Sequence, residues 1–557
     1  MSYWRGDSVK SAKESVEVDL EELEKLLEGK QEALGEEDYE KLKKGLWALR
    51  YLTDLIGDKD TTISQLRALL VKPSTEKTSK VLEQAGLKSS PQNRNSAASG
   101  NQKGNEEPKP GHGRHGAEAY RGAERIRIAH ASLKPGDHCP HCLKGKIYEQ
   151  KEPALRIRVV GQAPVAATVY ELERLRCNLC GDVFEAEAPP GVGEKKYDES
   201  AAAMIGLLKY GSGVPFYRLA GLEENLGIPL PASTQWDIVE EVAKLIRPVF
   251  DELIRQGAQG EVFCNDDTSM KILALARASP PQTGMQEETS EAHERTGLFT
   301  SGIVSTRQGQ RIALFFTGQQ HAGENLAQVL AHRAAELPLP IQVCDASTRN
   351  VPKLPEKLQT ILGNCNAHAR RRFVDVVANF PDECRYVLES FAEVYRYDAQ
   401  AEELGLSPEE RLRFHQAHSQ PVMDKLYVWL HAQFDERKVE PNSGLGIAIR
   451  YVLRHWHPLT LFLRQPGTPL DSNIVERALK KAILHRKNSQ FYKTKNGAEV
   501  GDLFMSLIHT CELNGANPFD YLIELQKHTS ELAENPGACM PWNYQEILRK
   551  AATQPSR

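Results

Sequence analysis

Apolar residues at intervals of three and four positions predict a helical segment at the start of the chain. Residues 16–70 keep this spacing among many Glu and Lys residues, with heptad-like positions at Tyr39, Leu42, Leu46, Leu49 and Ile56. Such a pattern is typical of a helix that pairs with a second copy, and equally of an amphipathic helix that packs on its own chain. We interpret residues 1–71 as a helical, leucine-zipper-like segment.

The next stretch, residues 72–118, has almost no large apolar groups. It is rich in Ser, Asn, Gly and Pro, most clearly in the string SSPQNRNSAASGNQKGNEEPKPGHGRHG. A composition of this kind buries too little apolar surface to offset the entropy that is lost on ordering. We expect a flexible linker here.

Short strand-like runs return in residues 119–195, and helical spacing follows in residues 196–258. Within the second segment, Tyr217–Trp236 contains a helix, a turn rich in Gly and Pro, and the start of another helix. This order fits a helix-turn-helix-like unit, and it fits plain helical packing as well.

Strand-like runs dominate residues 260–345. They are short, apolar and bounded by turn or polar residues: Val262–Asn265, Ile272–Ala276, Gly302–Ser305, Arg311–Phe316 and Ile341–Cys344. We expect one helix over Glu324–Ala335, helices throughout residues 366–460, and a final helix pair over 473–487 and 497–513. Strands and helices in this order predict an α/β core.

Length and composition place this core in a larger protein. A chain of 557 residues is too long for one hydrophobic core, and its hydrophobic and charged fractions, 40% and 26%, are those of ordinary globular proteins. The N-terminus has no apolar run for a signal peptide, and no stretch reaches the roughly 18 apolar residues of a membrane span. We therefore expect a cytoplasmic protein. The formal net charge of -5 does not itself indicate a nucleic-acid partner, but an average hides basic patches.

Four of the ten cysteines form two C-x-x-C pairs, Cys139 with Cys142 and Cys177 with Cys180. Each pair offers two thiolates about one turn apart, which suits half of a tetrahedral zinc site. Disulfides are rare in the cytoplasm, so one structural Zn²⁺ is the favoured interpretation, with redox chemistry or unligated thiols as alternatives. The other six cysteines show no pairing rhythm and fit buried thiols.

Two aspartates follow apolar strand-like runs. Asp266 comes after Val262–Asn265, and Asp345 comes after Ile341–Cys344. Each carboxylate is therefore expected at the edge of a sheet, where ligands gather in α/β proteins. Taken singly, each aspartate also fits a turn residue that ends a strand.

Glu476 begins a helix whose far end is basic. It borders the apolar stripe of that helix, and Lys480 and Lys487 fall on nearly the same helical face. No acidic residue occurs between Lys480 and Lys495. A carboxylate that holds a metal beside cations that hold phosphates is what a DNA-cutting site needs. The alternative is a capping box, because Asn473-x-x-Glu476 fits that pattern.

Five strings in the chain are characteristic together: Asn265-Asp-Asp-Thr268, Cys365-Asn-Ala-His-Ala-Arg-Arg-Arg-Phe373, Asp471-Ser-Asn-Ile-Val-Glu-Arg-Ala-Leu479, Arg486-Lys-Asn488 and Leu513-Asn-Gly-Ala-Asn-Pro-Phe-Asp-Tyr-Leu522. In these strings the chain resembles transposases of the insertion sequence 66 family. The order of parts matches too, from a zipper-like helix through a zinc-binding segment to a catalytic domain. The resemblance covers most of residues 16–525 and is most specific around Glu476.

In that family the catalytic domain is similar to ribonuclease H and carries an Asp, Asp, Glu triad. The resemblance implies Asp266, Asp345 and Glu476 as this triad and as ligands of two Mg²⁺ (or Mn²⁺) ions. The family commonly has Asp-Gly-Tyr at the second aspartate, where this chain has Asp345-Ala-Ser. Asp267 is the other candidate at the first position, but side chains alternate across a strand, so only one of the neighbours can face the site.

The resemblance further implies double-stranded DNA as the partner, both transposon ends and target, in a bacterial, nucleoid-associated protein. A homo-oligomer is expected, with accessory proteins of the same element as possible partners. Residues expected near DNA are Lys480, Lys487, Arg486, Arg370, Arg371 and His368. For His368, a packed histidine on a helix is the alternative.

The resulting interpretation is a DDE-type transposase that frees a 3′-hydroxyl at the transposon end and joins it to target DNA by two-metal phosphoryl transfer. The expected fold class is α/β, with a ribonuclease-H-like core, a large helical insertion, an N-terminal helical segment and a zinc ribbon. The expected boundaries are 259–380 and 466–525 for the core, 381–465 for the insertion and 526–557 for a tail. The alternatives are an inactive or domesticated DNA-binding relative and a zinc-ribbon nuclease or regulator unrelated to transposition.

Overall fold

The computed structural model describes residues 195–276, 297–355 and 358–544, with parts of 77–84, 125–148 and 162–192 and the single residues Tyr39 and Lys43. Most of the zipper-like segment and of the expected linker, as well as Cys177 and Cys180, lie outside the described residues. The chain forms two compact units. We call Met1–Ser89 with Asn366–Pro466 the helical unit, and Ser90–Cys365 with Gly467–Arg557 the sheet unit.

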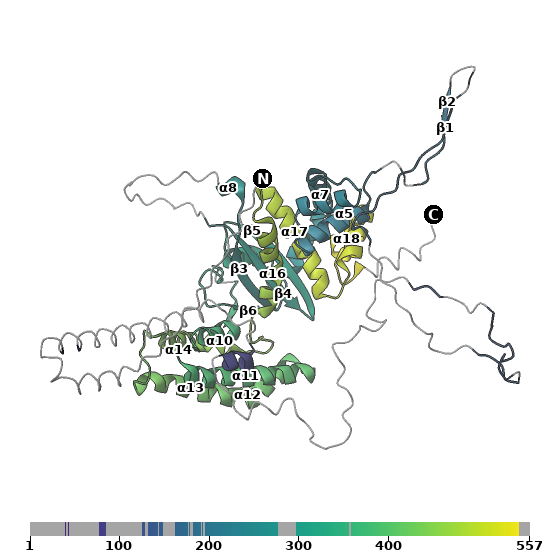
Figure 1. Cartoon of the computed structure of the whole chain (residues 1–557). Helices are drawn as coiled ribbons and strands as arrows, with labels where there is room; N and C mark the ends of the chain where they lie inside the picture. Colours follow the sequence, from purple (N-terminus) through teal and green to yellow (C-terminus); the bar gives the residue numbers. More distant parts are fainter. Residues whose placement is uncertain are drawn as a thin grey trace, which may run out of the picture. The chain divides into compact units, whose positions relative to one another are not determined.

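A mixed five-stranded sheet organises the sheet unit (Figure 1). Its strands are β3 (Val262–Ser269), β4 (Phe299–Arg307), β5 (Gln310–Gly318), β6 (Ile341–Cys344) and β7 (Ile361–Asn364), in the spatial order β5-β4-β3-β6-β7. Strands β3, β4 and β5 pair antiparallel in chain order, while β6 and β7 add parallel to β3 on its other side. This mixed sheet with flanking helices confirms the α/β class.

Two segments differ from the prediction in their type of secondary structure. Ile272–Ala276 was predicted as a strand, which is wrong: Leu273–Ala276 is the short helix α8, and Ile272 forms only an isolated bridge with Tyr492. A short apolar run does not by itself distinguish a strand from a buried helical turn. Strand β7 was not predicted, because its sequence Ile-Leu-Gly-Asn includes two residue types that are depleted in strands.

Helices cover both faces of the sheet. On one face, α7 (Ala232–Gly257) packs on β5. On the same face, α9 (Ala322–Leu330) packs on β3 and β4. On the other, α16 (Asn473–Ser489) packs on β3 and β4, and α17 (Lys495–Leu513) runs along β5. The apolar stripe of α16, with Val475, Ala478, Leu479 and Ala482, is buried as expected from its spacing.

Helix α17 closes the outer edge of β5 with polar side chains. Its residues at every fourth position accept the outward N–H groups of alternate strand residues, because four helical residues and two strand residues both advance by about 6 Å. The bonds join Asp502 to Thr317, Ser506 to Phe315, Thr510 to Ala313 and Asn514 to Arg311, at 2.6, 3.0, 3.1 and 3.1 Å. We call this set the edge ladder.

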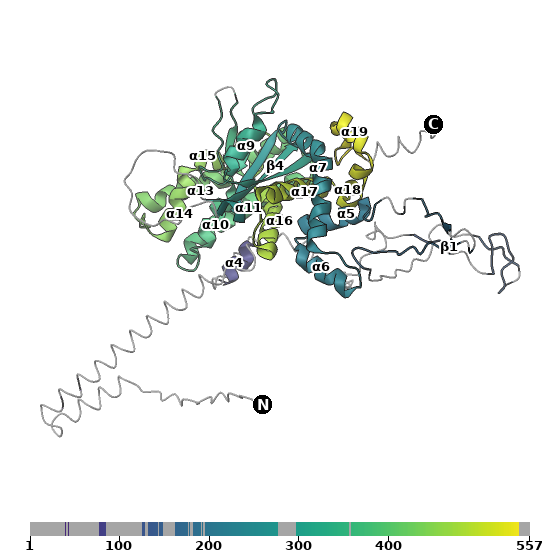
Figure 2. The same ribbon diagram turned by 90° about the horizontal axis from the view of Figure 1, so that it is seen from above.

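Further helices pack beside α7 and α17 (Figure 2). They are α5 (Glu199–Gly206), the π-helical turn η3 (Leu207–Gly211), α6 (Phe216–Asn225), α18 (Pro518–Lys527), α19 (Thr529–Glu534) and the 3₁₀ turn η5 (Pro536–Cys539). Helices α6 and α7 are the predicted pair around residues 217–236. Gly227 turns the chain between them with φ +79°, a conformation that favours glycine.

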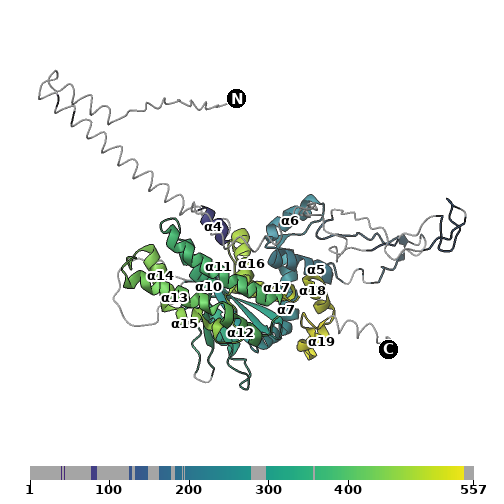
Figure 3. The ribbon, with the colours of Figure 1, turned by 90° about the horizontal axis from the view of Figure 1, so that it is seen from below.

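The helical unit contains the helices between β7 and Pro466 (Figure 3). They are α10 (Asn366–Val374), α11 (Pro381–Glu403), α12 (Pro408–His418), α13 (Gln420–Asp435), α14 (Gly444–Arg454), α15 (Trp456–Leu459) and the 3₁₀ turn η4 (Leu461–Leu463). Helix α4 (Thr78–Gln84), within the expected linker, belongs to the same unit and buries Val81 and Leu82. The second part of this unit begins at Asn366 with α10.

A short antiparallel hairpin, β1 (Arg174–Arg176) with β2 (Val183–Glu185), is described in the cysteine-bearing segment. A separate observation concerns membranes: none of the helices in the described part of the chain combines the length and the apolar character needed for a membrane span.

Candidate active site

The sheet brings the two predicted aspartates together. Asp266 lies within β3 and not after it, which corrects its expected place at a strand end. The pairing of β3 with β6 ends at Cys264, so β3 continues past the end of β6. Asp345 directly follows β6 and therefore lies next to the part of β3 that carries Asp266.

A buried asparagine links the two carboxylates. The Nδ2 atom of Asn350 donates to Oδ1 of Asp266 at 3.1 Å and to Oδ1 of Asp345 at 2.6 Å. The two carboxylate oxygens are therefore separated by no more than the sum of these distances. Both aspartates are half-buried and Asn350 is 2% exposed. Asn350 therefore lies on the protein side of the two carboxylates.

Polar side chains inside the sheet hold Asn350 in place. Its backbone carbonyl accepts from Nδ2 of Asn265 at 2.7 Å and from Nε2 of Gln342 at 2.8 Å. Gln342 also donates to Oδ1 of Asn265 at 2.8 Å and accepts from Oγ1 of Thr360 at 3.0 Å. Asn265 and Gln342 are fully buried, and buried polar groups with satisfied hydrogen bonds fix one arrangement of their surroundings.

Sequence reasoning missed this network. Asn350 lies in a loop, where an asparagine is unremarkable. A signal was nevertheless present, because Asn265 and Gln342 are polar residues inside short apolar strands, and such residues need partners when they are buried.

Asp267, the other candidate at the first position, points to the opposite face. Its Oδ2 lies 2.9 Å from Nδ1 of His321, which caps helix α9. Asp267 pairs across the sheet with Ser301, which accepts from Asn325 of the same helix. The alternation of side chains therefore leaves Asp266 on the face that α16 covers.

Two chains of contact bring the start of α16 to the aspartates. Asp266 pairs with Gly302 on β4, and a Cβ atom on Gly302 would lie 3.2 Å from Val475 and 3.0 Å from Leu479. Glu476 follows Val475 in the same turn of the helix and is half-buried.

The second chain of contact runs through thiols. The backbone N–H of Ser472, at the start of α16, donates to Sγ of Cys365 at 3.3 Å. The N–H of Cys365 in turn donates to the carbonyl of Cys344, the residue before Asp345. Burial raises the pKa of the Cys344 thiol, and the negative charges of Asp345 and Asp266 raise it further. The start of α16 thus lies at the end of the sheet that carries both aspartates.

The capping-box alternative for Glu476 does not describe this helix. Ser472 is the residue before the first turn, and it makes no side-chain capping bond. Asn473 is the first helical residue, and its amide donates to Asp471 at 2.7 Å. Glu476 is therefore one position too late in the helix to complete the box.

The predicted basic residues of α16 divide into two kinds. Lys480 and Lys487 are exposed on the face that Glu476 begins. The guanidinium of Arg486 instead donates to Oγ1 of Thr268 at 3.1 Å and to Oγ of Ser269 at 2.6 Å. Arg486 therefore ties α16 to the end of β3, whereas the lysines remain accessible to a phosphate backbone.

The other residues expected near DNA lie on α10 of the helical unit. Arg370 is 7% exposed and donates to Oγ1 of Thr78 at 3.2 Å, whereas Arg371 is exposed. His368 is half-buried on the same helix. Within this unit Arg370 thus fastens α4 to α10.

The first cysteine pair forms a tight turn. The N–H of Cys139 donates to the carbonyl of Gly145 at 2.8 Å, and the N–H of Gly145 donates to Sγ of Cys142 at 3.4 Å. Hydrogen bonds from the backbone of Gly145 and Lys144 and from the thiol of Cys139 lower the pKa of Cys142. Such a pair suits a soft cation that binds thiolates. The hairpin of β1 and β2 flanks the second pair in the sequence.

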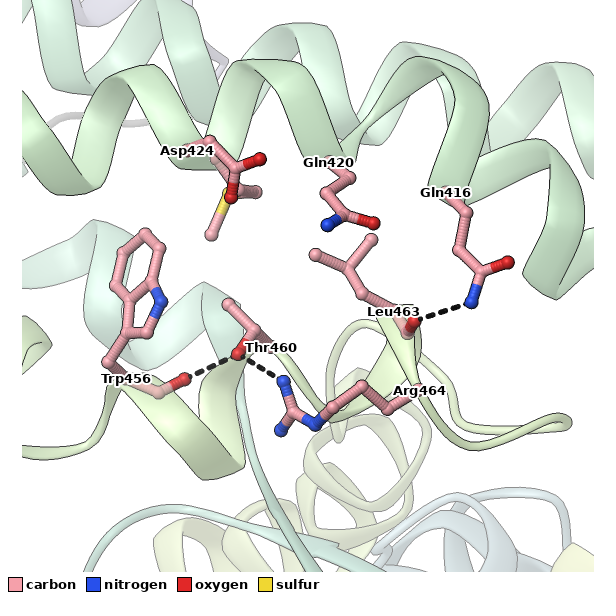
Figure 4. A pocket seen from close by; sticks show the side chains of 8 residues that line it. Gln416, Gln420, Asp424, Trp456, Thr460, Leu463 and Arg464 are labelled. Atoms are coloured by element: carbon pink, nitrogen blue, oxygen red, sulfur yellow. Dashed lines mark hydrogen bonds between the residues drawn. The ribbon is translucent and has the colours of Figure 1, made fainter.

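The helical unit contains a hollow of about 300 Å³ between α12, α13 and the segment from α15 to η4 (Figure 4). Its polar groups bond mainly within the unit: Gln416 donates to the carbonyl of Leu463 at 3.1 Å, and Arg464 donates to Oγ1 of Thr460 at 2.9 Å. Asp424 is the one carboxylate among its lining residues. A lone carboxylate is a poor site for a divalent cation, so the pair on the sheet is the better candidate.

A pair of adjoining carboxylates on a mixed sheet, with a glutamate-bearing helix over the same face, is a site of the kind that metal-dependent enzymes of phosphate chemistry use. Comparison with known families gives this site its context. The profile of the Transposase IS66 family matches residues 195–500, and the chain belongs to that family.

Curated relatives come from Sinorhizobium fredii and have no described activity. The uncharacterized protein y4jD is 29% identical over 428 residues, which are 74% of this chain and 79% of the relative. The uncharacterized protein y4hP is 25% identical over 452 residues, or 76% of this chain and 75% of the relative. The similarity to these proteins therefore extends beyond residues 195–500.

Proposed function

We propose that this chain is a DNA transposase of the DDE type, which cuts DNA at the ends of a mobile element and joins the freed 3′-hydroxyl to target DNA. The observation that carries the proposal is the meeting of Asp266 and Asp345 on one nitrogen atom of Asn350. Family membership supports the reaction class. The strand order supports a ribonuclease-H-like core, since three antiparallel strands are followed by two that add parallel to the first.

The donor groups fit a hard divalent cation. Asp266, Asp345 and Glu476 offer carboxylate oxygen, which Mg²⁺ and Mn²⁺ prefer, and the first two already share a donor of partial positive charge. Bound there, such cations polarise a phosphate and lower the pKa of an attacking water or hydroxyl group. Asp266 and Asp345 would hold two ions from the sheet, and Glu476 would hold them from α16.

The surrounding residues position DNA and keep the carboxylates in place. Lys480 and Lys487 bind phosphates along α16, which orients the scissile bond without reading sequence. The buried bonds of Asn265 and Gln342 fix the loop of Asn350. As a further part of the proposal, one Zn²⁺ on the two cysteine pairs has a structural role, the chain acts as a homo-oligomer on double-stranded DNA, and accessory proteins of the same element assist it.

The test is strand cleavage and strand transfer on transposon-end DNA with Mg²⁺ or Mn²⁺. We expect Asp266→Ala, Asp345→Ala and Glu476→Ala each to lower both activities by more than about a hundredfold, because removing a direct ligand costs more than removing its supporting partner. DNA binding should remain nearly unchanged, since the phosphate-binding lysines are intact. Asp267→Ala is the matched control, because its side chain faces α9, and it should keep most of the activity.

A second candidate is an inactive or domesticated relative that binds DNA without cutting it. Wild-type protein that binds transposon ends but yields no cleavage or transfer with either cation would favour that candidate. An active Glu476→Ala variant would instead overturn the assignment of the third ligand.

A further inference from the structure

Asn350 occupies the place between the two aspartates with a hydrogen-bond donor. In an asparagine amide, one carbon carries both the NH₂ group, which has two hydrogens to donate, and the carbonyl oxygen, which accepts. The nitrogen and the oxygen point in different directions. Both hydrogens are used here, one on Asp266 and one on Asp345. The oxygen Oδ1 is therefore turned away from the space between the carboxylates.

The backbone of Asn350 is held independently of this amide. Its carbonyl accepts from Asn265 and Gln342, and its N–H donates to the carbonyl of Ser347 at 3.1 Å. Ser347 also donates its N–H to Oδ1 of Asp345 at 3.0 Å. A half-turn of the side-chain amide would exchange Oδ1 and Nδ2 without disturbing any of these backbone bonds.

The electrostatic repulsion between the two carboxylates depends on the group that lies between them. Two carboxylates at this separation repel each other, and the N–H₂ group of Asn350 offsets part of the repulsion. A divalent cation offsets it more strongly, but the hydrogens of the amide cannot face a cation. Binding of the cation therefore forces either the asparagine side chain away or its oxygen toward the ion.

We propose that Asn350 is an additional oxygen ligand of the cation that Asp266 and Asp345 hold, and that its amide turns over when the ion binds. The inference rests on the proposed function, which supplies the cation. In the metal-free protein Nδ2 keeps the two aspartates together, and in the loaded protein Oδ1 takes its place beside the ion. Amide carbonyls are ordinary ligands of hard cations. Because the backbone of Asn350 is held by hydrogen bonds, rotating the side-chain amide costs less free energy than displacing the loop.

A purely structural asparagine would space the aspartates and touch no ion. Binding of Mn²⁺ alone to the full chain, without DNA, distinguishes the two roles by electron paramagnetic resonance or calorimetry. We expect Asn350→Ala to weaken Mn²⁺ binding by about tenfold or more. Affinity regained in Asn350→Asp, which restores an oxygen, separates a lost ligand from a lost supporting partner. Asp266→Ala provides the reference for a lost site.

Asn350→Asp is the second variant, and it remains informative if the alanine variant does not fold. An aspartate presents oxygen in either orientation, so Mn²⁺ binding should be as tight as in the wild type or tighter. Without metal, three carboxylates should lower the melting temperature, and added Mn²⁺ should raise it by more than in the wild type. The matched control is Asn325→Asp, which places a carboxylate at a buried asparagine of α9 on the opposite face. This control should lose stability without any gain from Mn²⁺.

The outcomes separate the inference from the function on which it rests. Mn²⁺ affinity that falls in Asp266→Ala but is unchanged in Asn350→Ala would overturn the ligand role of Asn350 and leave the proposed function intact. An Asn350→Asp variant that Mn²⁺ stabilises no more than it stabilises the wild type would also overturn it. Mn²⁺ binding that does not depend on Asp266 would overturn the proposed function itself.

Discussion

Asp266 on β3 and Gly302 on β4 face each other across the sheet, and the side chain that Gly302 lacks is replaced by Val475 and Leu479 of α16. The glycine therefore sets how closely the helix of Glu476 approaches the first aspartate. The position carries no unusual backbone angle, so its requirement is for space and not for conformation.

Gly302→Ala should therefore move α16. The new Cβ would lie 3.0 Å from Leu479 and 3.2 Å from Val475, so the helix must shift by a few tenths of an ångström. Overpacking of this kind costs about 1–3 kcal/mol, and cleavage should fall because Glu476 moves with the helix. Gly221→Ala is the matched control, since no described residue has an atom within 4 Å of the added Cβ, and it should be neutral or slightly stabilising. Full activity and an unchanged melting temperature in Gly302→Ala would contradict the placement of α16.

The basic face of α16 predicts a salt-dependent effect. Replacing Lys480 and Lys487 with Ala should weaken binding to DNA of any sequence and lower the slope of log K against log salt by about 0.9 for each lost phosphate contact. Fluorescence anisotropy over a series of salt concentrations measures this slope. An unchanged slope would count against phosphate contact.

Arg486→Ala should behave differently from the two lysine variants. Its guanidinium bonds to Thr268 and Ser269 at the end of β3, so its loss should lower the melting temperature and the cleavage rate. The expected loss is on the order of 1.5–3 kcal/mol, as for a hydrogen bond to a charged group. A variant with normal stability and a reduced salt slope would show instead that Arg486 acts mainly on DNA.

His485 predicts sensitivity to acid. The imidazole stacks on Tyr492 with ring centroids 4.4 Å apart, and its two buried nitrogens have no hydrogen-bond partner among the residues that the structure describes. Burial, together with the charge of Lys209, lowers its pKa from 6.5 to about 3. The unfolded chain takes up this proton as the pH falls below about 6.5 whereas the folded protein does not, so stability is lost between pH 6.5 and 3, by up to about 1.4 kcal/mol per pH unit.

His485→Phe should remove this dependence, because phenylalanine keeps the stacked ring and takes up no proton. Its melting temperature should exceed that of the wild type at pH 5 by more than it does at pH 8. His457→Phe, at an exposed histidine of α15, is the control and should follow the wild type at both pH values. Parallel pH profiles for wild type and His485→Phe would argue against a buried neutral imidazole.

The cysteine pairs predict about one zinc ion per chain. Metal analysis should find it in the wild type and not in a Cys139→Ser, Cys142→Ser double variant, because this pair supplies half of the ligands. A Cys177→Ser, Cys180→Ser variant should behave alike, and Cys539→Ser, at a buried thiol far along the chain, should keep its zinc. A folded wild type without zinc would overturn the proposal.

Strands with uninterrupted apolar runs could be predicted from the sequence, as β4, β5 and β6 show. The proximity of Asp266 and Asp345 could be predicted because the apolar runs of β3 and β6 end beside them. The contact of Asn350 with both aspartates could not be predicted. It depends on a loop that folds back to the sheet, and the spacing of apolar residues does not predict the path of a loop. Strand β7 was missed for a related reason: its pairing with β6 outweighs the weak strand preference of Gly363 and Asn364.

The edge ladder has a consequence for how copies of this chain can meet. An open edge strand offers a row of unpaired N–H groups, and a strand from another molecule can add to it, which leads to domain exchange or aggregation. On β5 alternate outward N–H groups from Arg311 to Thr317 already donate to side chains of α17 and of Asn514, the residue that follows it. A second copy of the chain therefore cannot extend the sheet at β5. Strand addition there would require α17 to detach first. The covered edge therefore protects the protein from self-association through β5, even at high local concentration.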